Sequence, residues 1–312
     1  MRLTKILLPA MVAGLLVAPA AEARKYNVRV GIGDQNPAMF SHPDFKRLKI
    51  KRVRYFIPWH AVTQPHEMQR ADEYVRAARA ARVSVFMHIS SDNLTRRAAR
   101  LPSKRRYRRL VRRLVRHYRA MGVREWGSRN EANHDSQATW KSPRRAAWEF
   151  KTVRRACKRC TVVGLDLLDQ RGSQRYVRRF FRALGSRRWR RRVSVVGIHN
   201  YADVNRRRTS GMRTIMRAVR RYNRRAKFWL TETGGLVRLS TSWPYSQRRA
   251  ASRLRYMFRI TRRYRRHIKR LYIYNWTGAP RGFRFDAGLV NPDGSRRPGY
   301  RVVARNIKRF RR

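Results

Sequence analysis

Acidic residues are scarce in this sequence. Its 312 residues include 17 Asp and Glu against 79 Lys and Arg, which gives a formal net charge of +62. Arginine fills the solvated faces of predicted helices, as in SKRRYRRLVRRLVRHYRAM at 103–121, so a compositional bias and a functional charge are both open explanations. In either case we expect non-specific polyanion binding at low salt, because a field of this strength attracts any chain of negative charges.

The sequence also lacks the motifs that mark specific nucleic-acid recognition. It contains neither a zinc-finger spacing of Cys and His nor a short aromatic RNA-binding motif. Its arginines are spread along the whole chain instead of being gathered in one module. We therefore predict no specific nucleic-acid partner.

Cysteine is nearly absent, with only Cys157 and Cys160 in the stretch ACKRCTVV. A structural zinc site needs about four ligands, and no further soft ligand lies near this pair. A redox Cys-x-x-Cys motif expects a helix N-terminus that lowers the pKa of one thiol, whereas here a predicted helix ends and a strand begins. We predict a small disulfide loop between the two cysteines, which suits an exported chain.

Long apolar runs are missing after the first residues. The N-terminal stretch carries two basic residues, then an apolar run from Ile6 to Ala18, and then an Ala-x-Ala site that ends at Ala23. This order is typical of a secretory signal peptide, and the run is shorter than the ~20 residues that an uncleaved membrane anchor needs. We predict a signal peptide at 1–23 and a mature chain at 24–312 that is secreted or attached to the cell envelope, without a transmembrane segment.

Short β-branched and aromatic runs alternate with longer segments of helical period along the mature chain. This alternation is typical of a parallel sheet whose strands are connected by helices. No linker rich in Pro, Gly or Ser divides the chain, so we predict one α/β domain, a single (β/α)8 TIM barrel. The predicted strands span 26–35, 52–59, 83–90, 123–131, 161–169, 193–201, 227–235 and 270–278.

Polar and aromatic side chains lie at the ends of these predicted strands. In a TIM barrel the carboxyl ends of the strands surround the active site. For His88 a purely structural role is an equal alternative, and for Trp59 core packing is nearly so. We interpret Asp34, Asp166 and Asp169 as caps of loops or partners of arginine. The candidate site residues are Arg54, Trp59, His88, Asn130, Glu131, His199, Tyr201, Glu232 and Trp276.

Two of the few acidic residues, Glu131 and Glu232, end the predicted strands four and seven. Cleavage of a glycosidic bond needs one carboxyl group that protonates the leaving oxygen and another that attacks the anomeric carbon or activates water. Carboxyl groups roughly 5–5.5 Å apart give retention, and ~6.5–9.5 Å gives inversion. From the residues alone, both outcomes are open.

The sequence resembles clan A of the glycoside hydrolases over nearly the whole mature chain. Members of this clan are (β/α)8 barrels with the acid/base in an Asn-Glu pair after strand four and a nucleophilic glutamate after strand seven. The stretch SRNEANH matches the first feature through Asn130 and Glu131, and WLTETGG matches the second through Glu232. Further matches are Arg54 on strand two, His199 and Tyr201 on strand six, and Trp276 on strand eight.

The resemblance implies a secreted retaining β-glycosidase with Glu131 as acid/base and Glu232 as nucleophile. Burial and the charge on Glu232 would raise the pKa of Glu131, so that it holds a proton near neutral pH. Arg54 and Tyr201 would stabilise an ionised Glu232 through charge and a hydrogen bond. Asn130 would bind the sugar 2-hydroxyl group.

The remaining candidates would shape the sugar site. Trp276 would offer an apolar face to a pyranose ring, and His88 and Trp59 would line a neighbouring position. The chain departs from the clan pattern at Ala132, where many members have proline. Arg129, directly before the Asn-Glu pair, has no assigned role, and strand alternation would direct it away from Asn130.

Three classes of function remain open. The first is hydrolysis of a carbohydrate substrate, including an anionic polysaccharide. The second is a catalytically weak carbohydrate- or polyanion-binding barrel at the cell envelope, and the third is a polycation that coats anionic envelope polymers. We expect no metal and no organic cofactor, because the two-glutamate mechanism needs only carboxyl groups and water.

Overall fold

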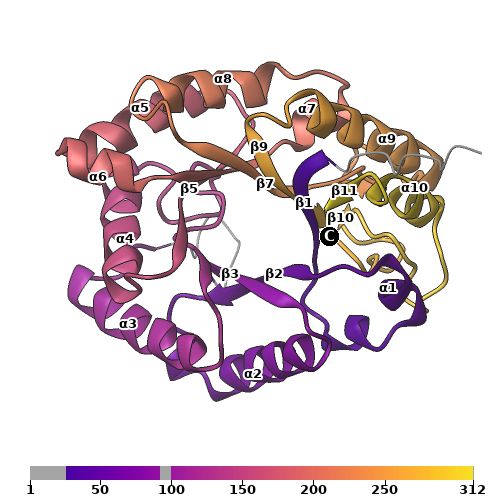
Figure 1. Ribbon diagram of the computed structural model, residues 1–312, viewed down its shortest axis with the longest axis horizontal. Helices are drawn as coiled ribbons and strands as arrows, with labels where there is room; N and C mark the ends of the chain where they lie inside the picture. The colour runs from indigo at the N-terminus through magenta and orange to yellow at the C-terminus, as the bar shows by residue number, and fades with distance from the viewer. Residues whose placement is uncertain (1–25, 92–99, 312) are drawn as a thin grey trace, which may run out of the picture.

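The computed structural model describes residues 26–91 and 100–311, which form one closed barrel of parallel strands (Figure 1). The strands follow one another around the barrel in chain order, and β9 pairs with β1 to close it, in register from Arg29 with Arg270 to Gly33 with Tyr274. The predicted (β/α)8 TIM barrel is therefore confirmed. The barrel strands are β1 (Tyr26–Gly33), β2 (Arg52–Pro58), β3 (Ser84–Ser90), β4 (Glu125–Gly127), β5 (Thr161–Leu168), β6 (Val195–His199), β7 (Lys227–Thr233) and β9 (Ile268–Tyr274).

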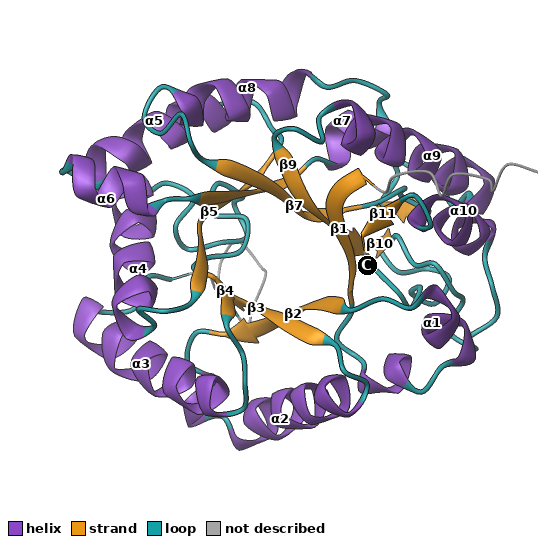
Figure 2. Ribbon diagram, in the orientation of Figure 1, coloured by secondary structure: helices purple, strands orange, loops and turns teal. Residues whose placement is uncertain are grey.

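Helices form a ring outside these strands (Figure 2). They are α1 (Pro43–Leu48), α2 (Pro65–Ala80), α3 (Lys104–Ala120), α4 (Pro143–Ala156), α5 (Ser173–Ala183), α6 (Arg187–Arg192), α7 (Tyr201–Asn205), α8 (Ser210–Arg220), α9 (Gln247–Arg263) and α10 (Pro298–Ile307), with the 3-10 turns Pro37–Phe40 and Ala61–Thr63. Two short strands, β8 (Arg238–Leu239) and β10 (Phe285–Asp286), pair antiparallel with each other, and β11 (Phe310–Arg311) pairs with the start of β1. Among the described helices, none combines the length and the apolar character that crossing a membrane requires.

The helix α3 illustrates how an arginine-rich sequence still packs on the barrel. Its buried residues recur every three or four positions and are Tyr107, Leu110, Val111, Leu114, Val115 and Tyr118. This spacing places them on one face of a helix, while the arginines between them lie in solvent. The hydroxyl group of Ser103 accepts a hydrogen bond from the amide of Arg106 (3.2 Å) and caps the first turn. The charge therefore lies outside the packing interface.

The barrel interior is filled by aromatic side chains below the predicted site. Phe86, Val163, Val195, Trp229 and Tyr272 form a separate buried cluster. Alternate residues of a barrel strand face the interior. The residues two positions after Phe86, Trp229 and Tyr272 therefore also point inward, closer to the carboxyl ends of the strands; they are His88, Thr231 and Tyr274. The aromatic cluster closes the barrel from below and forms the floor on which the polar groups of the mouth lie.

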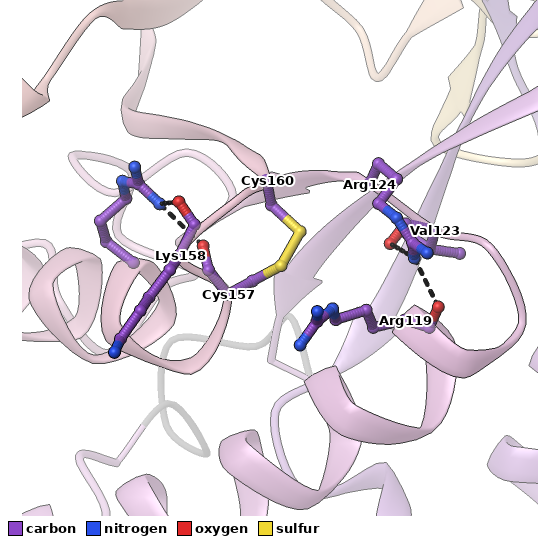
Figure 3. Close-up of a disulfide and its surroundings, with 7 residues drawn as sticks. Arg119, Val123, Arg124, Cys157, Lys158 and Cys160 are labelled. Atoms are coloured by element: carbon purple, nitrogen blue, oxygen red, sulfur yellow. Dashed lines mark hydrogen bonds between the residues drawn. A yellow bond between two sulfur atoms is a disulfide. The ribbon is translucent and has the colours of Figure 1, made fainter.

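The predicted disulfide between Cys157 and Cys160 is present (Figure 3). Their Cα atoms lie 5.4 Å apart, and the bond closes the turn that connects α4 to β5. Nη1 of Arg154 donates to the carbonyl oxygen of Cys157 (2.8 Å) and caps the end of α4. The neighbouring turn between α3 and β4 is held similarly by Arg124, whose Nη1 donates to the carbonyl oxygen of Arg119 (2.5 Å). Both turns lie at the end of the barrel opposite the mouth.

Some predicted boundaries differ from the structure. The strand predicted at 123–131 ends at Gly127, because the following amides bond to the two neighbouring strands in turn: Ser128 to the carbonyl oxygen of Val163 (3.2 Å), and Asn130 to that of Ile89 (2.9 Å). The strand predicted at 193–201 ends at His199, since α7 begins at Tyr201. The predicted signal peptide at 1–23 and its cleavage site lie outside the described residues.

Candidate active site

The strand ends bring seven of the nine candidate residues together at the barrel mouth. Arg54 occupies the centre, with its side chain 1% exposed. Its Nη1 donates to Oε2 of Glu232 (2.6 Å), and its Nη2 donates to Oδ1 of Asn130 (2.7 Å). One guanidinium group from β2 therefore fixes side chains that follow β4 and end β7. The seven residues are Arg54, His88, Asn130, Glu131, His199, Tyr201 and Glu232.

His88 on β3 supports Arg54 from below. Nε of Arg54 donates to Nδ1 of His88 (3.1 Å), so this ring nitrogen acts as an acceptor. Burial lowers the pKa of His88 to about 3, and the neutral ring leaves its proton on Nε2, which lies 3.4 Å from Oδ2 of Asp166. His88 is completely buried, so it positions Arg54 and does not itself line an open pocket.

Both carboxylate oxygens of Glu232 accept hydrogen bonds. Arg54 donates to Oε2, and the hydroxyl group of Tyr201 donates to Oε1 (2.9 Å). Burial and the charge of Glu232 raise the pKa of Tyr201 well above its usual value, so the hydroxyl group stays a donor. A charge-assisted pair on one oxygen and a fixed donor on the other suit a carboxylate that must stay ionised and oriented.

Glu131 lies just beyond β4 in a left-handed backbone conformation, with φ of 38°. This region costs a non-glycine residue roughly 1–2 kcal/mol, so the surrounding backbone must hold it. The amide of Asn130 bonds to the carbonyl oxygen of Ile89 (2.9 Å) in β3, and the amide of Ala132 bonds to that of Asp166 (2.9 Å) in β5. Glu131 is thus anchored on both sides and its side chain is directed across the mouth.

His199 links the two glutamates to a third carboxylate. Its Nδ1 lies 3.0 Å from Oε1 of Glu131 and 3.7 Å from Oε2 of Glu232, and its Nε2 lies 2.7 Å from Oδ2 of Asp166. Burial alone would lower the pKa of His199, but the charges of Asp166 and Glu232 and the hydrogen bonds to Asp166 and Glu131 raise it to about 10. At neutral pH the ring is an imidazolium that donates from both nitrogens.

The predicted rise in the pKa of Glu131 is wrong. Burial does raise it, but the hydrogen bond and the charge of His199 lower it by more, so the net shift is downward. The prediction considered burial and Glu232 and left out the imidazolium 3.0 Å away. The resting site therefore holds its mobile proton on His199 and not on Glu131.

Asp166, which we interpreted as a loop cap or arginine partner, organises the site from β5. Its Oδ2 faces His88, His199 and, at 3.7 Å, Arg54. Its Oδ1 accepts from the hydroxyl group of Thr231 on β7. Although burial opposes ionisation, the charge of His199 and its hydrogen bond lower the pKa of Asp166. The available signal was an acidic residue in the middle of the apolar strand VVGLDLL.

Close packing around Asp166 also explains one glycine. A Cβ atom added to Gly197 on β6 would collide with Oδ1 of Asp166 and with the hydroxyl group of Thr231. The absence of a side chain at this point of β6 is what lets the carboxylate of Asp166 reach His199. Any substitution of Gly197 is expected to displace this carboxylate.

Asp34 and Asp169 act as caps, as predicted. Oδ1 of Asp34 accepts from the amides of the next two residues, and its Oδ2 accepts from the amide of Thr277 (2.7 Å), which ties the loop after β1 to the loop after β9. Asp169 accepts from the amides of Ala202 (3.0 Å) and Asp203 (2.7 Å) at the start of α7. Both residues fix mouth loops.

Arg129 and Asn130 have separate partners, although β4 ends before them and strand alternation does not apply: Asn130 bonds to Arg54, and Arg129 is buried against α3 and α4. Its Nε donates to Oε2 of Glu149 (2.9 Å), while Nε of Arg145 donates to Oε1 of the same residue (3.0 Å). Glu149 is completely buried and Arg129 is 2% exposed. The Tyr107 ring lies beside both guanidinium groups. Arg129 thus anchors the segment that carries Asn130 to α4.

The two tryptophans among the candidates lie away from this cluster. Trp59 stacks on the ring of Tyr107 with centroids 5.8 Å apart and is 9% exposed, so it packs between the barrel and α3. Trp276 is 2% exposed and contacts the rings of Phe45 in α1 (5.6 Å) and Tyr300 in α10 (6.1 Å). The structure therefore gives both tryptophans packing contacts with the helical layer instead of a place in the mouth.

Tyr274, the last residue of β9, lies where Trp276 was expected. Its ring is 6.0 Å from that of Phe56 and 6.0 Å from that of Phe285. Burial and then the charge of Glu232 raise its pKa, which indicates proximity to the nucleophile candidate. Tyr274 and Trp276 share the same alternation in the sequence, but β9 ends at Tyr274, so the pattern does not extend to the tryptophan.

The two candidate catalytic glutamates are close together. One oxygen of Glu131, one oxygen of Glu232 and one ring nitrogen of His199 all lie within 4.8 Å of one another. This closeness places both carboxyl groups at one point of the mouth, where one can face an anomeric carbon while the other faces the leaving oxygen.

The same three residues are also a possible set of metal ligands. A cation bound there would have to displace the proton from His199, whose pKa is raised to about 10. It would also have to lie beside Arg54, whose guanidinium group is 2.6 Å from Glu232. Because a positive charge already occupies each side of the pair, the arrangement favours proton transfer over metal binding.

Solved glycoside hydrolases share this fold. A glucosidase from Croceicoccus marinus matches with a TM-score of 0.68 at 14% sequence identity, over 93% of this chain and 67% of that chain. A family 39 glycoside hydrolase from Bacteroides cellulosilyticus matches with 0.62 at 15%, over 92% and 64%. Xylanase XynB from Paenibacillus barcinonensis matches with 0.61 at 13%, over 91% and 99%.

At these identities the likeness establishes a common barrel fold. No protein-family model matches the chain, and no curated protein matches it. The side-chain geometry at the mouth is therefore the basis for any statement about activity.

Proposed function

We propose that this chain is a retaining β-glycosidase of clan A that hydrolyses O-glycosidic bonds in a polysaccharide or glycoside. The observation that carries the proposal is the pair of glutamates that follow β4 and β7, with oxygens within 4.8 Å of each other. Arg54 and Tyr201 hold Glu232 in one orientation, and His199 holds Glu131. The predicted signal peptide makes an extracellular or envelope substrate the natural choice.

In the first step, an oxygen of Glu232 attacks the anomeric carbon and forms a glycosyl ester while the glycosidic bond breaks. Glu131 delivers a proton to the leaving oxygen. That proton comes from Nδ1 of His199 along the 3.0 Å hydrogen bond, so the imidazolium becomes neutral as Glu131 is used as an acid. In the second step Glu131 takes a proton from water, the hydroxide attacks the anomeric carbon, and Glu232 is released. Return of the proton to His199 restores the site.

Asn130 supplies a fixed donor for the substrate. Its Oδ1 accepts from Arg54 (2.7 Å), so its amide nitrogen is left to donate to a sugar hydroxyl group. Hydrogen bonds to the 2-hydroxyl group strengthen as the anomeric carbon becomes positive. Tyr274, instead of the predicted Trp276, provides an aromatic surface beside the glutamates.

The activities named for the structural neighbours suggest the first substrates to try. One neighbour is a glucosidase and another is a xylanase. We therefore propose β-glucosides and β-xylosides, as aryl glycosides and as polymers, as the starting panel.

The test is release of reducing ends and aryl groups by the native protein, Glu232→Gln and Glu131→Gln. Loss of the nucleophile is expected to reduce kcat/KM by more than about 10³-fold. Glu73→Gln, an exposed residue on α2, is the matched control and should retain native rates. A 2-deoxy-2-fluoro glycoside should add one sugar mass to Glu232 in the intact protein.

Absence of release from every substrate, with glycans still bound, would reject hydrolysis in favour of a catalytically weak binding barrel. The charge of the outer helices supports that second candidate. The helices α3, α4, α5 and α6 contain one acidic residue, Glu149, and it is completely buried. Polymer binding that disappears in salt and survives Glu131→Gln is the signature of this alternative.

A further inference from the structure

Exposed large apolar side chains are rare in the described part of the chain. They are Leu101, Tyr245 and Phe283, with exposed fractions of 42%, 37% and 60%. All three lie in segments that follow barrel strands, and such segments surround the mouth of a TIM barrel. The two aromatic residues occupy the loops after β7 and β9, at 236–246 and 278–288.

These two loops form one unit. β8 and β10 pair with Leu239 opposite Phe285, and the amide of Ser240 donates to the carbonyl oxygen of Arg284 (2.7 Å). The guanidinium group of Arg281 lies 5.5 Å from the centre of the Tyr245 ring and connects the outer parts of the loops. We call Tyr245, Phe283, Arg281 and Arg284 the mouth platform.

The mouth platform is continuous with the candidate catalytic groups. The ring of Phe285 lies 5.8 Å from that of Tyr201 and 6.0 Å from that of Tyr274. The hydroxyl group of Tyr201 in turn bonds to Glu232. Ring contacts therefore extend from the nucleophile candidate to Phe285, and Phe283, with its exposed ring, lies two residues before Phe285 in the same loop.

The charge of this unit is uniformly positive where it meets solvent. Arg281 and Arg284 are exposed, and the acidic residue within the two loops, Asp286, is 3% exposed. Nη1 of Arg297 donates to both oxygens of Asp286 at 2.8 Å, so that carboxylate is already neutralised. Asp293, in the following turn, accepts from the amide and hydroxyl group of Ser295.

Aromatic rings and guanidinium groups bind different parts of an acidic sugar. A ring offers an apolar face to the C–H groups of a pyranose, and a guanidinium group binds a carboxylate or sulfate through two parallel hydrogen bonds. A neutral glycan would use the rings and leave the two guanidinium groups without an anionic partner. Because the mouth platform contains both aromatic rings and guanidinium groups, it fits a glycan whose units carry negative charge.

We propose that the mouth platform binds acidic sugar units, bearing carboxylate or sulfate groups, of a chain that extends from the candidate catalytic glutamates. This inference rests on the proposed function and names its substrate class as an anionic polysaccharide cut internally. Tyr201 and Phe285 connect Glu232 to the loop that carries Phe283. In this proposal, therefore, the unit bound at the mouth platform is not the unit whose bond is cleaved.

The first experiment measures binding to the Glu232→Gln protein in physiological salt, so hydrolysis is not needed. The probes are a β-1,4-linked hexamer of mannuronate and β-1,4-mannohexaose, which differ by a carboxylate in place of a hydroxymethyl group. We expect the acidic hexamer to bind at least about tenfold more tightly. Adding Arg281→Gln and Arg284→Gln should remove most of this difference and change binding of the neutral hexamer by less than about twofold.

The matched control for charge is Arg113→Gln with Arg116→Gln, which removes two exposed arginines from the outer face of α3. If the control substitutions weaken binding of the acidic hexamer as much as Arg281→Gln with Arg284→Gln does, the hexamer binds to the charged surface in general and the proposal fails. Equal affinity for both hexamers also overturns it. A single-stranded oligonucleotide that competes with the acidic hexamer and loses affinity in the mouth variant would assign the mouth platform to nucleic acid instead.

A second experiment uses the catalytically intact protein with Phe283→Ala and Tyr245→Ala. Phe283 is 60% exposed, so its removal leaves the core intact. We expect kcat/KM on an acidic polymer to fall at least about tenfold further than kcat/KM on a small aryl glycoside. Equal losses on both substrates would overturn the proposal. Selective binding of the acidic hexamer by a protein that hydrolyses nothing would instead reject the proposed function and retain the mouth platform.

Discussion

The barrel mouth and the outer helical wall use arginine in opposite ways. At the mouth, Arg54 is buried and makes hydrogen bonds to Glu232, Asn130 and His88. On the wall formed by α3 to α6, most arginines lie in solvent, and the buried Arg145 pairs with the one acidic residue, Glu149. The charge of Arg54 is therefore fixed in position and weakly screened, whereas the charge of the exposed wall arginines is mobile and screened by salt.

This difference indicates which arginines are needed for the candidate active site. A buried arginine with three partners cannot be replaced without leaving a carboxylate unpaired, because burial makes an isolated charge costly. An exposed arginine on the wall is surrounded by other exposed arginines, so its loss changes the local charge only slightly. Substitutions that remove charge from the two regions should therefore differ strongly in effect.

The largest effect is expected for Arg54→Met. Loss of the guanidinium group leaves Glu232 without its closest cation and should cost about 3–5 kcal/mol in the free energy of unfolding. Activity should fall by more than about 10³-fold, since Glu232 and Asn130 both lose their orientation. Arg52→Met, on the same strand beside Glu125, is the control. A native rate for Arg54→Met, measured on an aryl glycoside, would contradict the proposed site.

A second prediction concerns the proton held by His199. Asp166→Asn removes the charge that raises the pKa of His199, so the ring should lose its proton at a lower pH than about 10. The alkaline limb of kcat/KM should therefore move to lower pH, with a rate loss of roughly 10–100-fold near neutrality. An alkaline limb that stays in place, measured from pH 5 to 11, would show that His199 is not the proton source.

The same group makes stability depend on pH. The pKa of His199 is raised in the folded state to about 10 from its ordinary value of 6.5. Its contribution to stability is therefore complete below pH 6.5 and is lost as the pH rises through about 10. The native protein should lose more Tm between pH 7 and 10 than His199→Gln does. Parallel Tm curves for the two proteins would count against a charged His199.

A smaller and more selective effect is expected for Arg129→Met. Both Arg129 and Arg145 bond to the buried Glu149, so removing either should cost a similar 2–4 kcal/mol or so in stability. Arg129, however, is adjacent in sequence to Asn130. We expect Arg129→Met to lower kcat about tenfold with little change in KM, because Glu131 shifts from its productive position.

Arg145→Met provides the matched control for that prediction. It removes the other partner of Glu149 from α4, which carries no candidate catalytic residue. Thermal unfolding should show comparable losses for both variants, while kcat of Arg145→Met stays within about twofold of native. Equal losses of kcat in both variants would reduce the role of Arg129 to packing.

The comparison of mouth and wall also explains what the sequence could predict. The barrel was predictable because strand and helix periods repeat along the chain, and the catalytic candidates were predictable because they end strands. Trp276 was misplaced because alternation fails once β9 ends at Tyr274. The role of Asp166 and the pKa of Glu131 depend on contacts across β5, β6 and β4, which no local pattern contains. The pair β8 and β10 was missed because each strand is two residues long.

The smallest effect is expected on the wall itself. Arg113→Gln with Arg116→Gln should leave kcat/KM for a neutral aryl glycoside unchanged within about twofold, because exposed charges beyond a Debye length of ~8–10 Å are screened from the mouth. Retention on a sulfated polymer should shift to slightly lower salt, since each lost contact reduces the salt dependence by roughly one counterion. If the same pair of substitutions lowers turnover of the neutral substrate, the wall is coupled to the mouth, and the separation between fixed and screened charge does not hold.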